Sequence, residues 1–264
     1  MCLIVIAIDA HPEYPLIIAA NRDEFYSRPT AALDFWEDNP HILAGRDLQS
    51  RGTWLGVTPG GRIAAVTNYR DPSAMTPWGK SRGQLVKDFL AGDQQPESYL
   101  AEVEKQRDQY CGFNLLTGWL NQIWWYSNKN SGIVRLKAGI HGISNHLLDT
   151  PWPKVRTMKQ KLAALIDASP VIEPHAVLDL LYDPRPAADE HLPDTGVGKD
   201  WERTLSPVFV VSPDYGTRCS SALILDKNNR LQFWERTFLA DQAGPKPGET
   251  RRFELQWPDM PGTT

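Results

Sequence analysis

The sequence has few cysteines, and their spacing excludes the structures that cysteine most often builds. Three occur among the 264 residues, at Cys2, Cys111 and Cys219. An odd number at such wide spacing argues against a disulfide framework, and no Cys-x-x-Cys pair is present. The 6 histidines are dispersed and lack the spacing of zinc ligands. We therefore expect neither a metal site nor any other cofactor.

Long apolar runs and clusters of basic residues are also missing. The apolar run near the start, residues 3–7, is far shorter than the roughly 20 residues of a membrane-spanning helix. It also lacks the basic segment that precedes the apolar stretch of a secretory signal. The net charge is -4, and the scattered Lys and Arg form no basic cluster for nucleic acid. These absences predict a cytoplasmic protein with no membrane span and no nucleic-acid partner. No pattern indicates an oligomeric state.

The motifs of nucleotide-binding and serine enzymes do not occur either. No Gly-x-x-x-x-Gly-Lys-Ser/Thr loop is present, and Gly60-Gly61 is typical of a hairpin turn. No Gly-x-Ser-x-Gly elbow is found, and Ser220-Ser221 has no evident histidine partner. A catalytic centre, if there is one, must therefore be built from other residues.

What the sequence does contain is the pattern of a single α+β domain over residues 1–264. Hydrophobic residues make up 41%, a level typical of globular proteins, and no flexible linker divides the chain. Apolar runs between turn signals predict strands, and periodic apolar residues predict helices. The predicted strands are 3–8, 16–20, 54–57, 63–67, 113–117, 123–127, 139–144, 208–211, 221–225, 231–235 and 252–256. The predicted helices are 81–91, 97–106 and two that begin at Thr150 and Pro174.

Most of the predicted strands are joined by short turns, which favours antiparallel sheets. Two stacked sheets with helices outside would fit this order, and a single sheet covered by helices is the competing architecture. Residues 29–47 are expected to be irregular. Residues 183–201, which are rich in Pro, Gly and charge, indicate a long surface loop that would suit a lid.

Cys2 is a candidate nucleophile because of its place beside the start of the chain. If Met1 is removed, Cys2 carries the α-amine, whose ordinary pKa of about 8 leaves part of it neutral at physiological pH. Such an amine accepts the proton of its own side chain, so one residue serves as nucleophile and base. Removal of methionine requires a small second residue, and cysteine qualifies. The alternative interpretation is a buried cysteine that merely begins a strand.

The polar tetrad Asn21-Arg22-Asp23-Glu24 follows the second predicted strand. Antiparallel pairing within the first hairpin would bring it back to the start of the first strand. Arg22 would then favour the thiolate of Cys2, and Asp23 would hold or orient the amine. The alternative is an ordinary Arg-Asp ion pair.

Three further polar residues are expected beside predicted strands. Asn68 and Asn145 each offer an amide donor for a developing oxyanion. Arg218 is a candidate to bind a substrate carboxylate or to support the sulfur. Each asparagine alone is more often a turn residue, so the prediction depends on their joint placement.

The sequence resembles the NRDE-motif family, also called the Transport and Golgi organization 2 family, almost from end to end. The resemblance rests on the start Met1-Cys2-Leu3-Ile4 and on Ala20-Asn21-Arg22-Asp23-Glu24-Phe25. Further matching segments are Gly45-Arg46-Asp47, Gly52-Thr53-Trp54-Leu55-Gly56, Thr67-Asn68-Tyr69-Arg70, Ser81-Arg82-Gly83, Gly112-Phe113-Asn114-Leu115, Ser144-Asn145, Leu148-Asp149-Thr150-Pro151-Trp152-Pro153-Lys154-Val155 and Tyr215-Gly216-Thr217-Arg218.

This resemblance implies kinship with N-terminal-nucleophile hydrolases, whose fold is a four-layer αββα sandwich of two antiparallel sheets. Cysteine-type members of that group cleave non-peptide amide bonds. The expected catalytic residues are Cys2, Arg22, Asp23, Asn68, Asn145 and Arg218. The expected substrate-binding residues are Asn21, Glu24 and Tyr69. The acylases separate the Arg and the Asp by two residues, whereas here they are adjacent, so a strand would direct them to opposite faces.

Two functions follow as hypotheses. The first is an N-terminal-cysteine hydrolase that cleaves a non-peptide amide or ester bond of a small molecule through a thioester. The second is a non-catalytic binding or trafficking protein for haem, acyl-CoA or a lipid-like ligand, for which the 10 tryptophans would suit the walls of a cleft.

Overall fold

A long antiparallel hairpin opens the chain and lies within the first sheet. The computed structural model describes residues 2–74, 79–241 and 244–257, so Met1 and the end of the tail lie outside the described residues. The strands of the hairpin are β1 (Cys2–His11) and β2 (Tyr14–Phe25). Their many Ile, Leu, Val and Ala side chains favour a buried sheet. Because β2 extends to Phe25, the tetrad at residues 21–24 lies inside the strand, and its predicted place after the strand was wrong.

The first sheet has six strands in the order β10-β1-β2-β11-β12-β13. Each strand is antiparallel to its neighbours. The remaining strands of this sheet are β10 (Gly139–Ile143), β11 (Tyr215–Leu225), β12 (Arg230–Leu239) and β13 (Lys246–Gln256). The start of β1, the end of β2 and the start of β11 consequently meet at one end of the sheet.

The second sheet has seven strands in the order β3-β4-β5-β6-β7-β8-β9. They are β3 (Thr30–Trp36), β4 (Asn39–Asp47), β5 (Leu55–Val57), β6 (Arg62–Asn68), β7 (Phe113–Trp119), β8 (Gln122–Ser127) and β9 (Val134–Arg135). The prediction that residues 29–47 are irregular was therefore wrong. Two register shifts between β3 and β4 interrupt the alternation by which a strand is recognised.

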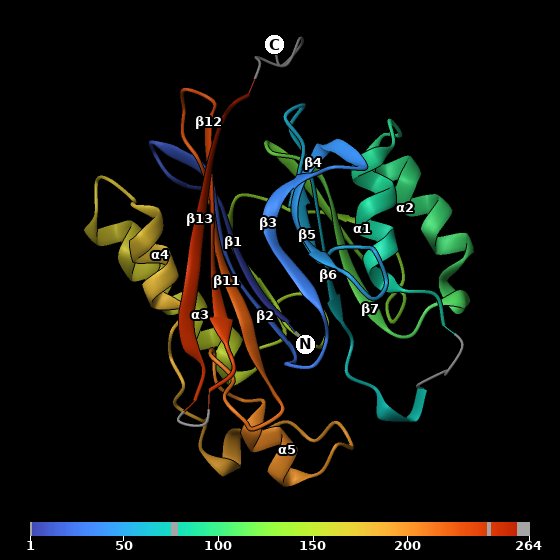
Figure 1. Ribbon diagram of the computed structural model, residues 1–264, viewed down its shortest axis with the longest axis vertical. Coiled ribbons are helices and arrows are strands. Elements are labelled where there is room, and N and C mark those ends of the chain that lie inside the picture. Colours follow the sequence, from blue (N-terminus) through green and yellow to red (C-terminus); the bar gives the residue numbers. More distant parts are fainter. Residues whose placement is uncertain (1, 75–78, 242–243, 258–264) are drawn as a thin grey trace.

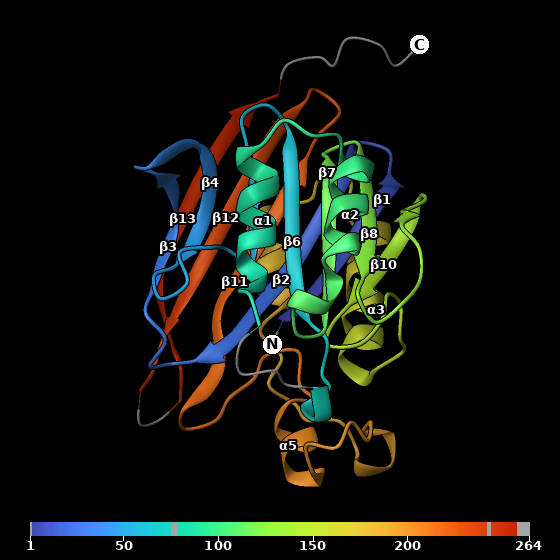
Figure 2. The same cartoon turned by 90° about the vertical axis from the view of Figure 1, so that its right-hand side faces the viewer.

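In the described part of the chain, four helices lie outside the two sheets and complete four layers, and a short fifth helix lies beyond one end of the sheets (Figures 1 and 2). They are α1 (Arg82–Ala91), α2 (Pro96–Lys105), α3 (Pro153–Ala168), α4 (Pro174–Leu180) and the short α5 (Lys199–Thr204). Short 3-10 helices occur at Pro72–Ala74, Arg107–Gln109 and Asp189–His191. α1 and α2 cover the seven-stranded sheet, and α3 and α4 cover the six-stranded sheet. The architecture is thus the predicted αββα sandwich.

Successive side chains of β1 point to opposite faces of the six-stranded sheet. Ile4 and Ile6 belong to the larger apolar core, which includes residues of both sheets and of α1 and α2. Leu3 and Val5 belong to the smaller core beneath α3 and α4. This period of two determines which polar side chains at the ends of the strands face the inter-sheet space. Within the described ranges, no helix is long and apolar enough to cross a membrane.

Two predicted elements differ from the structure. Residues 208–211 were predicted as a strand but form an irregular segment whose backbone N–H and C=O groups bond to Asp183 and Thr217. The third helix begins at Pro153, so the predicted cap at Thr150 was wrong. Trp152 precedes a proline and is held extended, which delays the helix. The Thr150 hydroxyl contacts His146 instead.

Candidate functional site

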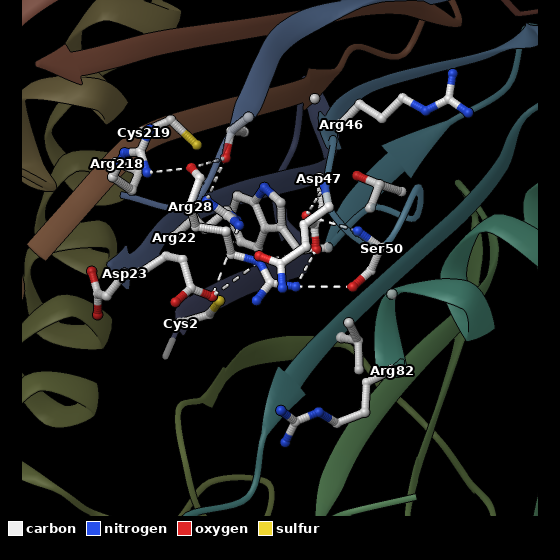
Figure 3. A pocket seen from close by; sticks show the side chains of 18 of the residues that line it. Cys2, Arg22, Asp23, Arg28, Arg46, Asp47, Ser50, Arg82, Arg218 and Cys219 are labelled. Atoms are coloured by element: carbon white, nitrogen blue, oxygen red, sulfur yellow. Dashed lines mark hydrogen bonds and ion pairs between the residues drawn. The ribbon is translucent and has the colours of Figure 1, made fainter. Parts of the chain in front are cut away.

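Cys2 begins β1 and faces the space between the sheets. It pairs with Arg22 in the antiparallel register of β1 and β2, so the predicted return of the tetrad to the chain start is observed. The residue is 8% exposed and lines a cavity of about 670 Å³ (Figure 3). Burial raises the pKa of the Cys2 thiol, and the charge of Arg22 opposes this rise. The thiol is thus accessible from a cavity but depends on nearby cations to ionise.

The adjacent residues Arg22 and Asp23 point to opposite faces of the sheet, as expected for a strand. Arg22 lines the cavity with Cys2 and donates a long hydrogen bond of 3.4 Å to Thr30. The carboxylate of Asp23 is directed away from the Cys2 sulfur and accepts a hydrogen bond of 2.7 Å from Thr217 (Figure 3). Burial raises the pKa of Asp23. Of these two side chains, only that of Arg22 is directed to the inter-sheet face with the thiol, although Asp23 also borders the cavity.

Lys154 lies behind this strand end on α3, and no pattern in the sequence predicts a role for it. Its side chain is 3% exposed, and its Nζ is 4.0 Å from a carboxylate oxygen of Asp23. No hydrogen-bond partner for this ammonium is found in the described part of the chain. Burial lowers the pKa of Lys154 to about 8, although Asp23 opposes the shift. The sequence does contain a signal for the burial of Lys154, because this residue lies one helical turn before Met158 on the apolar face of α3.

The two predicted amide donors occupy different positions. Asn68 ends β6 and lines the cavity, and its side chain has no hydrogen bond to the described residues. Asn145 is fully buried and donates to the Asn68 carbonyl at 2.9 Å. Its neighbour Ser144 donates to the carbonyl of Cys2 at 3.1 Å. Asn145 and Ser144 therefore connect the start of β1 with the end of β6, while Asn68 faces the cavity.

Arg218 lies at an irregularity in the pairing of β11 with β2, and it lines the cavity. Its guanidinium donates to the carbonyls of Phe25 at 2.8 Å and Arg28 at 2.9 Å. Burial lowers the pKa of Arg218, and repulsion from Arg22 adds to the effect. The structure thus brings Arg218 to the same cavity as Cys2, with part of its donor capacity used by the backbone.

The three expected substrate-binding residues are not brought together. Glu24 lines the cavity. Asn21 faces the helices. Its side chain donates hydrogen bonds to the carbonyls of Leu181 and Val208 and accepts one from the Ser220 hydroxyl. Tyr69 lies outside the cavity lining and contacts the ring of His146 through its hydroxyl at 2.9 Å. Of the three, Glu24 is the one placed to meet a ligand in this cavity.

Arg82, the first residue of α1, lines the cavity, and no pattern in the sequence predicts a role for it. It donates to the carbonyl of Gly112 at 3.2 Å. The start of α1 reaches the cavity because two glycines let the backbones approach closely. A Cβ at Gly52 would lie 2.5 Å from the carbonyl carbon of Gly83. The matching segment at residues 81–83 was visible in the sequence, but only the fold places it opposite Cys2.

The remaining polar lining comes from both sheets. Arg28 forms an ion pair of 2.7 Å with Asp47. Glu235 accepts a hydrogen bond from the backbone of Leu33 at 2.7 Å, and burial raises its pKa. All three cysteines line the cavity. Across the described ranges, no group of three His, Cys, Asp or Glu side chains is arranged to hold a metal ion. None of residues 183–201 lines the cavity, so the predicted lid does not border it here.

The chain is similar to members of one protein family over most of its length. A family model described as "Transport and Golgi organisation 2" matches residues 1–240. The Transport and Golgi organization protein 2 homolog of Bos taurus is 35% identical and covers 97% of this chain and 100% of its own length. The homolog of Homo sapiens is 34% identical, with the same shares covered.

A solved structure shares the architecture at much lower identity. The C2A mutant of the conjugated bile acid hydrolase from Clostridium perfringens matches with a TM-score of 0.50 and 8% identity, over 100% of both chains. At this identity the likeness concerns the fold alone. It agrees with the predicted fold of N-terminal-nucleophile hydrolases.

Proposed function

The chain belongs to the Transport and Golgi organisation 2 family, and on that premise we propose that it is an N-terminal-cysteine hydrolase. Its reaction is cleavage of a non-peptide amide or ester bond of a small molecule through a thioester on Cys2. The observation that carries the proposal is the position of Cys2, which faces a cavity of about 670 Å³ directly beside Arg22. A nucleophile needs this combination of access and an adjacent cation.

The first step of the proposed reaction uses the α-amine that removal of Met1 exposes. This amine takes the proton of the Cys2 thiol, and Arg22 stabilises the thiolate. Asp23, held by Thr217 on the helix side, stabilises the resulting ammonium. The sulfur then bonds to the substrate carbonyl carbon, and the negative charge moves to the carbonyl oxygen.

The second step breaks the bond to the leaving group. Asn68 donates to the oxyanion, which is most valuable in a site shielded from water. Asn145 acts as a positioning residue because it binds the Asn68 carbonyl. The leaving nitrogen or oxygen departs with the proton from the ammonium. The α-amine then deprotonates a water molecule, which attacks the thioester, releases the acid and regenerates Cys2.

An intact-mass measurement tests this proposal with p-nitrophenyl acetate as the probe. After acid quenching, the protein should have lost one methionine residue and gained one acetyl group. Peptide mapping should locate the acetyl group on Cys2, and hydroxylamine should remove it, because hydroxylamine cleaves a thioester but not an amide. Prior alkylation with iodoacetamide should prevent acetylation. Protein that turns over the ester while it retains Met1 would overturn the mechanism.

The polar walls of the cavity weigh against the alternative, a carrier for haem, acyl-CoA or a lipid-like ligand. Among the tryptophans at described positions, Trp54 lines the cavity, and the others lie elsewhere. Arginine and carboxylate side chains are prominent in the lining. Saturable binding of such a ligand, unchanged in Cys2→Ala and without any acyl adduct in the mass experiment, would favour the carrier over the hydrolase.

The Arg22→Gln variant should shift the reactivity of Cys2 to higher pH. The cation lowers the pKa of the thiol, so its removal raises that pKa and moves the onset of iodoacetamide labelling upward. We expect a shift of about 1 pH unit or more, since an opposite charge nearby commonly moves a pKa by this amount. Labelling rates between pH 6 and 10 measure it. Arg22→Lys is the matched control and should retain most of the wild-type profile, and equal profiles for all three proteins would exclude this role for Arg22.

A further inference from the structure

Three arginines that line the cavity have little or no carboxylate neutralisation. Arg82 and Arg218 make their hydrogen bonds to backbone carbonyls in the described part of the chain. Arg22 has a carboxylate of Glu24 at 4.0 Å, which is the limit of an ion pair. Clustered like charges of this kind repel one another and are costly in a partly buried site.

The carboxylates near these arginines are largely used elsewhere. Asp47 is paired with Arg28 and also accepts from the backbone N–H groups of Gln49 and Ser50. Glu235 has a pKa that burial raises, which favours its neutral form. Asp23 also borders the cavity, but its carboxylate is directed away from the thiol, and burial raises its pKa. Glu24 therefore remains as the main counter-charge, and it is also only 3.9 Å from Arg28. The cavity thus has more positive than negative charge.

Of these three arginines, Arg82 is the best placed to bind an anion in this positively charged cavity. It projects from the wall opposite Arg22 and Arg28, with its guanidinium directed toward the Cys2 side of the cavity (Figure 3). Burial lowers the pKa of Arg82, and the nearby groups of Cys111, Cys2 and Glu24 oppose this shift. The first turn of α1 forms the same wall, and the positive end of the helix dipole adds to the field.

We propose that Arg82, facing Arg22 across the cavity, binds an anionic group of the substrate, a carboxylate or a phosphate, beside the bond that Cys2 attacks. The identity of the bound molecule as a substrate rests on the proposed hydrolase function. The charge balance supports the subsite itself, because one thiolate at Cys2 neutralises only one of the three arginines. A planar guanidinium suits both groups, since it donates two parallel hydrogen bonds to carboxylate or phosphate oxygens.

The test compares the rates at which iodoacetate and iodoacetamide alkylate Cys2, measured by peptide mapping. Both reagents react with the thiolate, so their rate ratio is independent of the thiol pKa, and only iodoacetate carries a charge. Arg82→Gln should lower the iodoacetate-to-iodoacetamide ratio about tenfold, a modest loss for one charge pair in a partly buried site. Arg82→Lys, which keeps the charge, should retain most of the ratio. Arg156→Gln removes an exposed charge on α3 and should leave it unchanged.

Protection experiments distinguish the two anions. Inorganic phosphate or succinate should slow alkylation by neutral iodoacetamide in the wild-type protein but not in Arg82→Gln, and the stronger protector identifies the preferred group. An unchanged ratio in Arg82→Gln would overturn the subsite, even if both reagents became slower through a higher thiol pKa. A lowered ratio without acyl-enzyme formation would retain the subsite and reject the hydrolase, whereas the reverse result would retain only the hydrolase.

Discussion

Replacing Cys2 with alanine is expected to lower kcat/KM for p-nitrophenyl acetate by at least about 10³-fold, because removal of a nucleophile leaves only binding and oxyanion stabilisation. The initial burst of p-nitrophenol should disappear as well, since no thioester can accumulate. Cys2→Ser should retain a small residual rate, because a hydroxyl is a weaker nucleophile than a thiolate at neutral pH. Stopped-flow absorbance of p-nitrophenol measures both quantities.

These variants share a useful property. Alanine, serine and cysteine are all small, so the three proteins should lose Met1 equally. A matched variant with one lysine inserted between Met1 and Cys2 keeps the thiol but blocks this processing. We expect it to lose about 10²-fold or more in rate, because the α-amine can no longer act as the base. Full activity in the inserted variant would rule out the amine as the base, and full activity in Cys2→Ala would rule out the nucleophile.

The fold could be predicted in large part because its signals are local. The hairpin of β1 and β2 follows from two apolar runs around a turn, and α1 and α3 follow from apolar residues at helical spacing. The β3–β4 hairpin was missed because its register shifts break the alternation of buried and exposed side chains. Residues 208–211 were predicted as a strand because a short apolar run indicates burial but does not specify the backbone conformation. These errors arise where tertiary contacts, not local pattern, decide the backbone conformation.

The candidate site shows the same limit more sharply. The register of one hairpin was sufficient to place Arg22 opposite Cys2, and the period of a strand was sufficient to separate Arg22 from Asp23. Arg82 depends on how α1 packs against the sheet, and this packing requires two glycines in close contact. No spacing in the sequence reveals such an approach. Cys2 therefore remains the proposed centre of the site, but the opposite wall of its cavity could not be predicted from the sequence.

A buried ion pair holds the surface loop at residues 183–201 to the body of the protein. Arg70 and Glu202 form a short charged hydrogen bond, and their side chains are 5% and 3% exposed. The Arg70 guanidinium also lies 4.8 Å from the ring of Trp152. The other carboxylate oxygen of Glu202 accepts from the backbone and the hydroxyl of Thr195, at 2.9 and 2.5 Å. The carboxylate of Glu202 thus connects α5 with Thr195 in the loop and with Arg70, which lies two residues after the end of β6.

Glu202→Gln should therefore destabilise the protein by about 3 kcal/mol, because it removes the negative charge that lies against the buried guanidinium of Arg70. Urea denaturation measures the free energy of unfolding, and trypsin digestion should show faster cleavage within residues 183–201. The exposed pair Lys105–Glu102 provides the control, since Glu102→Gln should cost less than about 1 kcal/mol. The double variant Arg70→Met/Glu202→Leu should be more stable than Glu202→Gln, because it removes both charges together. If Glu202→Gln costs no more than Glu102→Gln, the loop is not anchored by this pair, and its freedom to act as a lid becomes the better interpretation.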